Sequence, residues 1–205
     1  MDDTKPNIKA VLFDIGGVLL RTTDPVPRAE INADYGLGAG GIEQLVFNSE
    51  HGQAAQLGQL TEGQLWEKVG VQIGQLDNIT AVRDKFWAGD SIDLDIVVWL
   101  RQLKTETDIT TAVISNYADN LIPDLTKYKV LDLFDHVTVS CQEGVLKPNP
   151  KIYTDTLSTI EATAQESIFI DDTLVNVQAA QELGITALHF QPDQTLAELK
   201  KLVKI

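Results

Sequence analysis

Polar residues that directly follow predicted strands are the part of this chain best suited to chemistry. Because the carboxyl ends of parallel strands share one edge of a sheet, such residues converge although they are far apart in the sequence. They are Asp14, the pair Ser115-Asn116 and the pair Asp171-Asp172, and Lys147, which lies in a loop, is a further candidate. Carboxylates brought together repel one another unless a cation lies between them, and hard oxygen ligands of this kind suit Mg²⁺. The sequence therefore predicts a Mg²⁺ site at one edge of a sheet.

Short apolar and β-branched runs predict the strands that must carry these residues. The first run, residues 8–13, ends in Asp14 and two glycines, as a buried strand does where it stops at a functional loop. Helical patterns separate the runs, and this alternation indicates an α/β fold: a Rossmann-like parallel sheet with helices on both faces. The other strands are predicted at 110–114, 136–139, 167–170 and 185–190.

The interval between residues 21 and 92 lacks a buried-strand pattern. Inside it, residues 61–69 and 79–87 have apolar side chains at helical spacing. We therefore expect a core domain formed by residues 1–20 and 93–205, and a small α-helical domain formed by residues 21–92.

Two further patterns concern helix ends. Residues 36–41 match the dinucleotide-binding pattern G-x-G-x-x-G, but the preceding residues 29–35 look helical rather than strand-like. We interpret this stretch as a helix end and loop, with nucleotide binding as the lesser alternative. Thr195 with Glu198 is a capping-box pattern and predicts the start of the last helix.

Each polar candidate also has an ordinary structural interpretation. Asp171-Asp172 could simply begin a helix, where acidic side chains favour the helix dipole. Lys147 before proline could be a solvated loop lysine, and Ser115-Asn116 could be turn chemistry. Their joint occurrence with Asp14 at strand ends favours a functional site over coincidence.

Four motifs in this order resemble those of the haloacid dehalogenase-like hydrolases. They are FDIGGV at 13–18, VISN at 113–116, GVLKP at 144–148 and FIDDTLVN at 169–176. The resemblance covers the whole chain, because the interval after the first motif matches the family's C1 helical cap. The amino-acid sequences of the motifs are most similar to those of the branch that contains the phosphatase domain of epoxide hydrolase and an α-glucose-1-phosphate phosphatase.

The resemblance implies a phosphatase whose nucleophile, Asp14, takes up the phosphoryl group as an aspartyl phosphate. It implies catalytic support from Ser115 and Lys147, which contact the phosphate. The substrate-binding residues that it implies are Gly17, Ser115, Asn116 and Lys147. The Mg²⁺ ligands that it implies are Asp14, Gly16 through its carbonyl, Asp171 and Asp172. It gives Asn176 a supporting role.

Gly16 is a departure from the family pattern. Phosphatases of the family usually have a second aspartate at this position, which protonates the leaving group. General acid catalysis of this kind contributes about 10²–10⁴-fold. The glycine therefore predicts that turnover depends steeply on the pKa of the leaving group.

The composition and charge of the chain limit the kinds of partner and the cellular location that we expect. Thirty acidic against 16 basic side chains give a formal net charge of −14, which repels nucleic acid and anionic membrane surfaces. No apolar run approaches the ~20 residues that cross a bilayer, and the N-terminus lacks a signal-peptide pattern. We expect a cytoplasmic monomer or homodimer whose partner is a small phosphate ester.

Three functions remain open on the sequence. The first is a Mg²⁺-dependent phosphatase of a small phosphorylated metabolite, such as a sugar phosphate. The second is a non-catalytic protein that binds a phosphometabolite or a protein partner, which Gly16 supports. The third is a 2-haloacid dehalogenase, which needs no metal, so the paired aspartates Asp171 and Asp172 argue against it.

Overall fold

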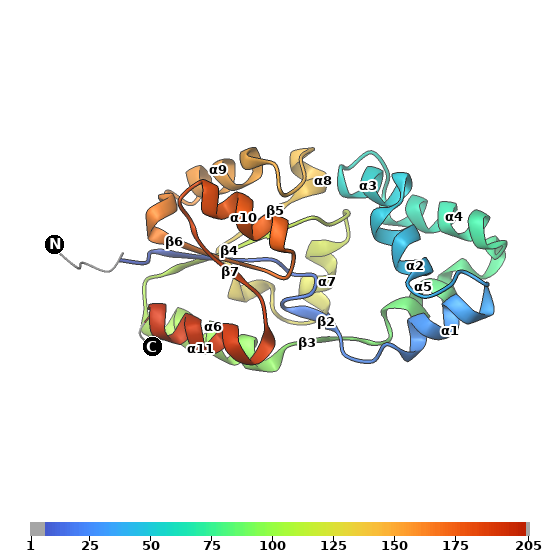
Figure 1. The fold of residues 1–205 in the computed structure, drawn as a ribbon, viewed down its shortest axis with the longest axis horizontal. Helices are drawn as coiled ribbons and strands as arrows, with labels where there is room; N and C mark the ends of the chain where they lie inside the picture. The colour runs from blue at the N-terminus through green and yellow to red at the C-terminus, as the bar shows by residue number, and fades with distance from the viewer. Residues whose placement is uncertain (1–6, 204–205) are drawn as a thin grey trace.

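The central sheet has five parallel strands in the order β5-β4-β1-β6-β7, with β1 in the middle. The sheet lies between two layers of helices (Figure 1). A computed structural model describes residues 7–203, except for the side chains at 193 and 194. The strands are β1 (Ala10–Phe13), β4 (Thr110–Ser115), β5 (His136–Val139), β6 (Ser167–Asp171) and β7 (Thr186–His189). All five predicted strands are confirmed. Residues 1–6 and 204–205, which the predicted core domain includes, lie outside the described residues.

Helices cover both faces of the sheet, as predicted. Successive side chains of β1 point to opposite faces, so Val11 and Phe13 join one apolar cluster and Ala10 and Leu12 another. The first cluster is closed by α6 (Leu94–Glu106), α7 (Leu121–Lys127) and α11 (Pro192–Val203), and the second by α9 (Pro150–Thr159) and α10 (Leu174–Glu182). Because helices cover both faces of the sheet, a ligand can reach the polar residues that follow the strands only from the strand ends.

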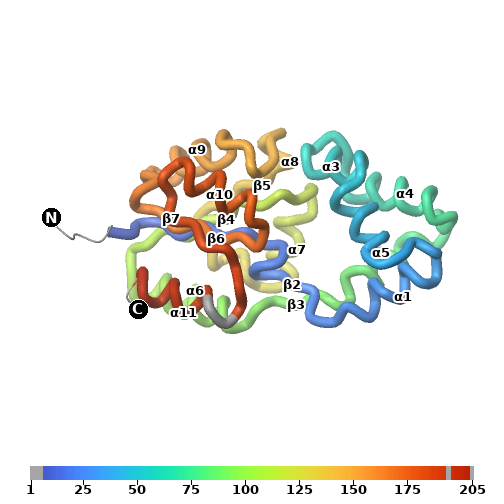
Figure 2. The backbone as a smooth tube through the Cα atoms, in the orientation of Figure 1, coloured from blue at the N-terminus to red at the C-terminus, as the bar shows by residue number. Residues whose placement is uncertain are grey.

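A helical segment leaves the sheet after β1 and returns before α6. Its two connections, β2 (Leu20–Thr22) and β3 (Asp90–Ile92), pair antiparallel and run side by side to the helices (Figure 2). The segment packs around its own apolar cluster, which includes Trp66 and Phe86. Its elements are α1 (Val26–Asp34), α2 (Gly41–Glu43), the π-helical turn η1 (Gln44–Asn48), α3 (Glu50–Gln56), α4 (Glu62–Ile73), η2 (Leu76–Asn78) and α5 (Ile79–Trp87). The predicted helical segment is therefore present, and its division from the core at residues 21 and 92 stays a prediction.

Three short helical elements complete the core: η3 (Leu131–Leu133), α8 (Ser140–Glu143) and η4 (Ala164–Glu166). The predicted capping box at Thr195 is wrong, because α11 already begins at Pro192, where the fixed φ of proline suits the first helical position. The Thr195 hydroxyl instead accepts a hydrogen bond from the Gln191 N–H, at 2.7 Å. Within residues 7–203, no helix is long and apolar enough to cross a membrane.

The glycine-rich stretch 36–41 covers the loop between α1 and α2 and the first residue of α2. Three of its glycines, Gly36, Gly38 and Gly40, have positive φ, and the element before them is a helix. A dinucleotide site needs a buried strand there. The interpretation as a helix end and loop is confirmed.

Candidate active site

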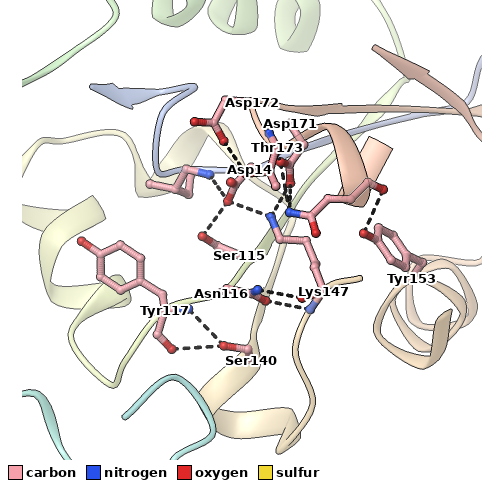
Figure 3. A network of polar contacts seen from close by, with 12 residues as sticks. Asp14, Ser115, Asn116, Tyr117, Ser140, Lys147, Tyr153, Asp171, Asp172 and Thr173 are labelled. Atoms are coloured by element: carbon pink, nitrogen blue, oxygen red, sulfur yellow. Dashed lines mark hydrogen bonds and ion pairs between the residues drawn. The ribbon is translucent and has the colours of Figure 1, made fainter. Parts of the chain in front are cut away.

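The carboxyl ends of three adjacent strands bring the predicted residues together (Figure 3). Asp14 directly follows β1, while Ser115 ends β4 and Asp171 ends β6, the two neighbours of β1 in the sheet. Their registers align Phe13 with both Val113 and Ile170, so each strand ends at nearly the same level. Parallel pairing therefore places residues from distant parts of the chain within hydrogen-bond distance of one another.

Three donors meet at one oxygen of the Asp14 carboxylate. Its Oδ1 accepts hydrogen bonds from the Ile15 N–H at 2.7 Å and from the Ser115 hydroxyl at 2.8 Å, and it lies 2.9 Å from Nζ of Lys147. Burial raises the pKa of Asp14 to about 6, against the lowering effect of Lys147 and with a further rise from Asp171. At neutral pH the carboxylate is thus still mostly ionised, as a nucleophile must be.

Lys147 is buried between two aspartates. Its Nζ lies 2.6 Å from Oδ2 of Asp171, as well as beside Asp14. Burial acts to lower the pKa of Lys147, but the two carboxylates outweigh it, so the pKa is raised. The amide of Asn116 holds the lysine backbone from both sides: Oδ1 accepts from the Lys147 N–H at 2.8 Å, and Nδ2 donates to its carbonyl at 3.0 Å. Lys147 is therefore a fixed, charged side chain rather than a solvated loop lysine.

Asp171 has its hydrogen-bonding capacity taken up within the protein. In addition to Lys147, it accepts from the Thr173 N–H at 2.7 Å and from Nδ2 of Asn176, at 3.1 Å to each oxygen. The Asn176 carbonyl in turn accepts from the Tyr153 hydroxyl at 3.1 Å. Asn176 thus supports Asp171 directly and Lys147 only through it.

Asp172 differs from its neighbour. It is exposed, and the one side-chain hydrogen bond to it among the described residues comes from the Thr173 hydroxyl, at 3.2 Å. Partial burial of its carboxylate, and then the nearby charge of Asp171, raise the pKa of Asp172. Oxygens of Asp14, Asp171 and Asp172 all lie within 4.8 Å of one another. Three carboxylates with one lysine leave an excess of negative charge, which is the condition a divalent cation would relieve.

The loop after Asp14 lies against Asp172. Gly17 has φ of +76°, and a Cβ there would overlap the Asp172 carboxylate. Gly16 is exposed, and a Cβ at that position would meet nothing within 4 Å. Of these two residues, therefore, only Gly17 is required to be glycine by its surroundings, whereas Gly16, the position that departs from the family pattern, has room for a side chain.

A cavity of about 510 Å³ lies above these residues, between the sheet edge and the helical segment. On the core side it is lined by Asp14, Gly16, Gly17, Leu20, Asn116, Tyr117, Lys147, Asp172, Thr173 and Asn176. The opposite wall includes Thr22, Arg28, Phe47, Asn48, Gln56, Trp87 and Asp90. The sequence analysis identified none of these wall residues as part of the site. Their spacing carries no local signal, because the wall forms only when the segment folds over the sheet.

Direct hydrogen bonds hold the helical segment on the core at one side of this cavity. The Ser140 hydroxyl donates to the Gln56 carbonyl at 2.7 Å and accepts from the Tyr117 N–H at 3.0 Å. The Asp119 carboxylate accepts from the Glu62 N–H at 2.8 Å. These bonds fix the wall residues relative to Asp14.

Comparisons with known proteins agree with this architecture. The family model described as haloacid dehalogenase-like hydrolase matches residues 8–184. A sesquiterpene phosphatase of Aspergillus oryzae is 31% identical over 202 residues, which cover 95% of this chain and 96% of that protein. The bifunctional epoxide hydrolase 2 of Rattus norvegicus is 29% identical over 138 residues, 65% of this chain and 25% of that protein.

A solved structure shares the fold across nearly the whole chain. An enzyme of the same family from Bacteroides thetaiotaomicron, in complex with magnesium and inorganic phosphate, superimposes with a TM-score of 0.78 at 22% identity, covering 94% of this chain and 98% of that one. The predicted α/β fold and the predicted resemblance are confirmed. Since the family model covers most of the chain, this protein belongs to the haloacid dehalogenase-like hydrolases.

Proposed function

We propose that the chain is a Mg²⁺-dependent phosphatase that acts on a small phosphorylated metabolite, such as a sugar phosphate, through an aspartyl phosphate on Asp14. One observation carries the proposal: the Asp14 carboxylate lies within 3 Å of both the Ser115 hydroxyl and the Lys147 ammonium, at the base of a cavity beside Asp172. A phosphoryl group in this cavity would meet a nucleophile and two donors together. The sesquiterpene phosphatase and the magnesium and phosphate complex among the relatives support the same chemistry.

The reaction follows in two displacements. An oxygen of Asp14 forms a bond to phosphorus while the bond from phosphorus to the ester oxygen breaks, and the ester oxygen keeps the bonding electrons and takes a proton from solvent. Water then attacks the phosphorus of the aspartyl phosphate, which releases inorganic phosphate and restores the Asp14 carboxylate. Ser115 and Lys147 donate to the phosphate oxygens, whose charge would otherwise repel the anionic nucleophile.

The carboxylates fit a magnesium ion, which would supply charge neutralisation for the phosphoryl group. We infer that Asp14 and Asp172 are the direct carboxylate ligands, because both oxygens of Asp171 already accept hydrogen bonds within the protein. Asp171 then serves to hold Lys147 in place and adds negative charge near the ion. The Gly16 carbonyl as a further ligand, and Gly17 and Asn116 as substrate contacts, belong to the same proposal.

The non-catalytic alternative rests on Gly16, which offers no acid for the leaving group. The dehalogenase alternative gains no support from the clustered carboxylates, since displacement of halide from carbon requires no cation.

Release of phosphate from aryl and sugar phosphates, measured with Mg²⁺ and after treatment with a chelator, tests the proposal. We expect activity only with Mg²⁺, and a loss of at least about 10³-fold in Asp14→Asn, because an amide is a poor nucleophile and a poor metal ligand. Asp108→Asn, an exposed aspartate in the loop before β4, is the matched control and should stay active. Full activity in the chelated enzyme or in Asp14→Asn would overturn the mechanism, and absence of turnover with all esters would favour the binding protein.

A further inference from the structure

The wall of the cavity that faces the leaving group contains a buried arginine. Among the described residues that line the cavity, the basic side chains are Lys147, at the phosphate end, and Arg28, in the helical segment. Arg28 lies on α1 and is only 8% exposed. A cation in this position would ordinarily attract substrates that carry a second anionic group.

Arg28 is already neutralised by a partner in the same wall. Its Nη2 lies 2.9 Å and 2.8 Å from the two carboxylate oxygens of Asp90, the first residue of β3. Its Nε donates to the Phe86 carbonyl at 3.2 Å. The side chain of Asp90 is even more buried than that of Arg28, at 5% against 10% exposure, so water screens the pair little.

Aromatic rings hold the guanidinium in this arrangement. The Cζ atom of Arg28 lies 4.1 Å from the centre of the Phe86 ring, and 5.7 Å and 5.8 Å from those of Trp87 and Phe47. Asp90 is held independently by the Thr22 hydroxyl, at 2.8 Å across the β2–β3 pair. Since both partners are fixed, a substrate cannot recruit Arg28 by displacing Asp90 without breaking contacts on each side.

We propose that Asp90 is a specificity-determining residue: by neutralising Arg28 in the cavity wall, it restricts turnover to phosphate esters whose leaving group carries no second negative charge. This inference rests on the proposed phosphatase function and names its substrate class. A carboxylate or second phosphate on the leaving group would be desolvated beside Asp90 without a cation to pair with. An uncharged leaving group would instead pack against the aromatic side chains of Phe47 and Trp87.

Two aryl esters that differ by one charge test the proposal: 4-carbamoylphenyl phosphate and 4-carboxyphenyl phosphate. We expect the wild-type enzyme to favour the carbamoyl ester by about tenfold or more in kcat/KM, mainly through KM, as a difference in binding free energy would produce. In Asp90→Asn, which leaves Arg28 unneutralised, that ratio should move at least about tenfold toward the carboxy ester. The comparison between variants cancels the small difference in leaving-group acidity.

Two further variants separate this effect from general charge and from misfolding. The double variant Arg28→Gln with Asp90→Asn removes both charges and should keep the wild-type preference. Asp34→Asn removes one exposed negative charge from α1, the helix that carries Arg28, at a position outside the cavity lining. It should not shift the ratio. Folding of each variant is checked by circular dichroism and thermal melting.

A wild-type ratio near one, or a folded Asp90→Asn whose ratio stays at the wild-type value, overturns the proposal. If Asp90→Asn does not fold, the kcat/KM ratios of the wild type and the double variant test the proposal instead. The proposal stands if both proteins favour the carbamoyl ester. It fails if the double variant loses that preference. If the wild type hydrolyses neither ester nor any other phosphate, the proposed function fails and this inference with it.

Discussion

Lys147 and Asp171 form an ion pair that is removed from water, with Nζ 2.6 Å from Oδ2 and side-chain exposures of 1% and 0%. The pair holds the lysine beside Asp14 before any ligand enters. Desolvated ion pairs contribute little net stability, but removing one partner leaves an uncompensated charge inside the protein. Lys147 therefore contributes both to the stability of the core and to the arrangement of the site around Asp14.

Lys147→Met should both destabilise the protein and abolish turnover. Without the ammonium, Asp14 and Asp171 repel each other in a buried position, and we expect a loss of about 3 kcal/mol in the free energy of unfolding. Urea denaturation without Mg²⁺ measures the stability, and phosphate release measures the activity. Lys68→Met, which changes an exposed lysine of α4, should alter neither. An unchanged unfolding midpoint in Lys147→Met would show that the pair is not structural.

Asn176 acts through Asp171, so its loss should appear in the response to metal. In Asn176→Ala, Asp171 loses a donor to each of its oxygens, and the carboxylate cluster is less well oriented. Partners of direct metal ligands typically change metal affinity by about 10–100-fold, and because Asp171 is not itself a direct ligand, the effect of Asn176 should lie at the lower end of that range. The Mg²⁺ concentration for half-maximal activity should rise accordingly, whereas Gln178→Ala, at an exposed position of the same helix, should leave it unchanged. A lower maximal rate with the same Mg²⁺ requirement would contradict this role.

The two adjacent glycines of the Asp14 loop should respond differently to alanine. At Gly17, the new Cβ would overlap the Asp172 carboxylate and the backbone would keep a left-handed φ, a strain of about 1–3 kcal/mol. At Gly16 the Cβ has open space. We therefore expect Gly17→Ala to lose activity and Mg²⁺ affinity, and Gly16→Ala to retain both. Equal effects in steady-state kinetics and metal titration would mean that Asp172 is not held against Gly17.

The sheet and the convergence of the site could be predicted from sequence because parallel strands obey simple rules. Apolar runs such as the one that ends before Asp14 mark the strands, and strand ends share one edge. Asp14, Ser115 and Asp171 could therefore be placed together although Ser115 lies 101 residues from Asp14. The same rules place side chains at an edge but do not say which atoms touch.

The opposite wall could not be predicted in the same way. Arg28 and Asp90 are 62 residues apart, and neither lies in a motif. Their meeting depends on β2 and β3, strands of three residues each, which are too short to show a period. The function of Asn176 was anticipated only as support, because the sequence does not reveal that its amide reaches both oxygens of Asp171. The capping-box pattern at Thr195 predicts the wrong start for the last helix, because α11 already begins at Pro192.

The cavity wall also bears on how the leaving group departs. Outside the cluster of Asp14, Asp171 and Asp172, the acidic residue among the described lining residues is Asp90, which is ion-paired to Arg28. Glu50 and His51, the titratable residues of α3, do not line the cavity. No described residue of the wall is therefore placed to protonate an ester oxygen.

The rate should consequently depend steeply on the leaving group, and Gly16→Asp should flatten that dependence. An unprotonated alkoxide develops more charge than an aryloxide or an anomeric oxygen, so aryl, acyl and sugar 1-phosphates should exceed sugar 6-phosphates. An aspartate at Gly16 has room for its Cβ, and it should raise kcat/KM for alkyl esters by about tenfold or more while changing aryl esters little. The measurement is kcat/KM over uncharged leaving groups of graded pKa, with Gly16→Asn as the matched variant that cannot donate a carboxylic proton. A shallow wild-type series with chemistry rate-limiting would mean that another acid serves the leaving group.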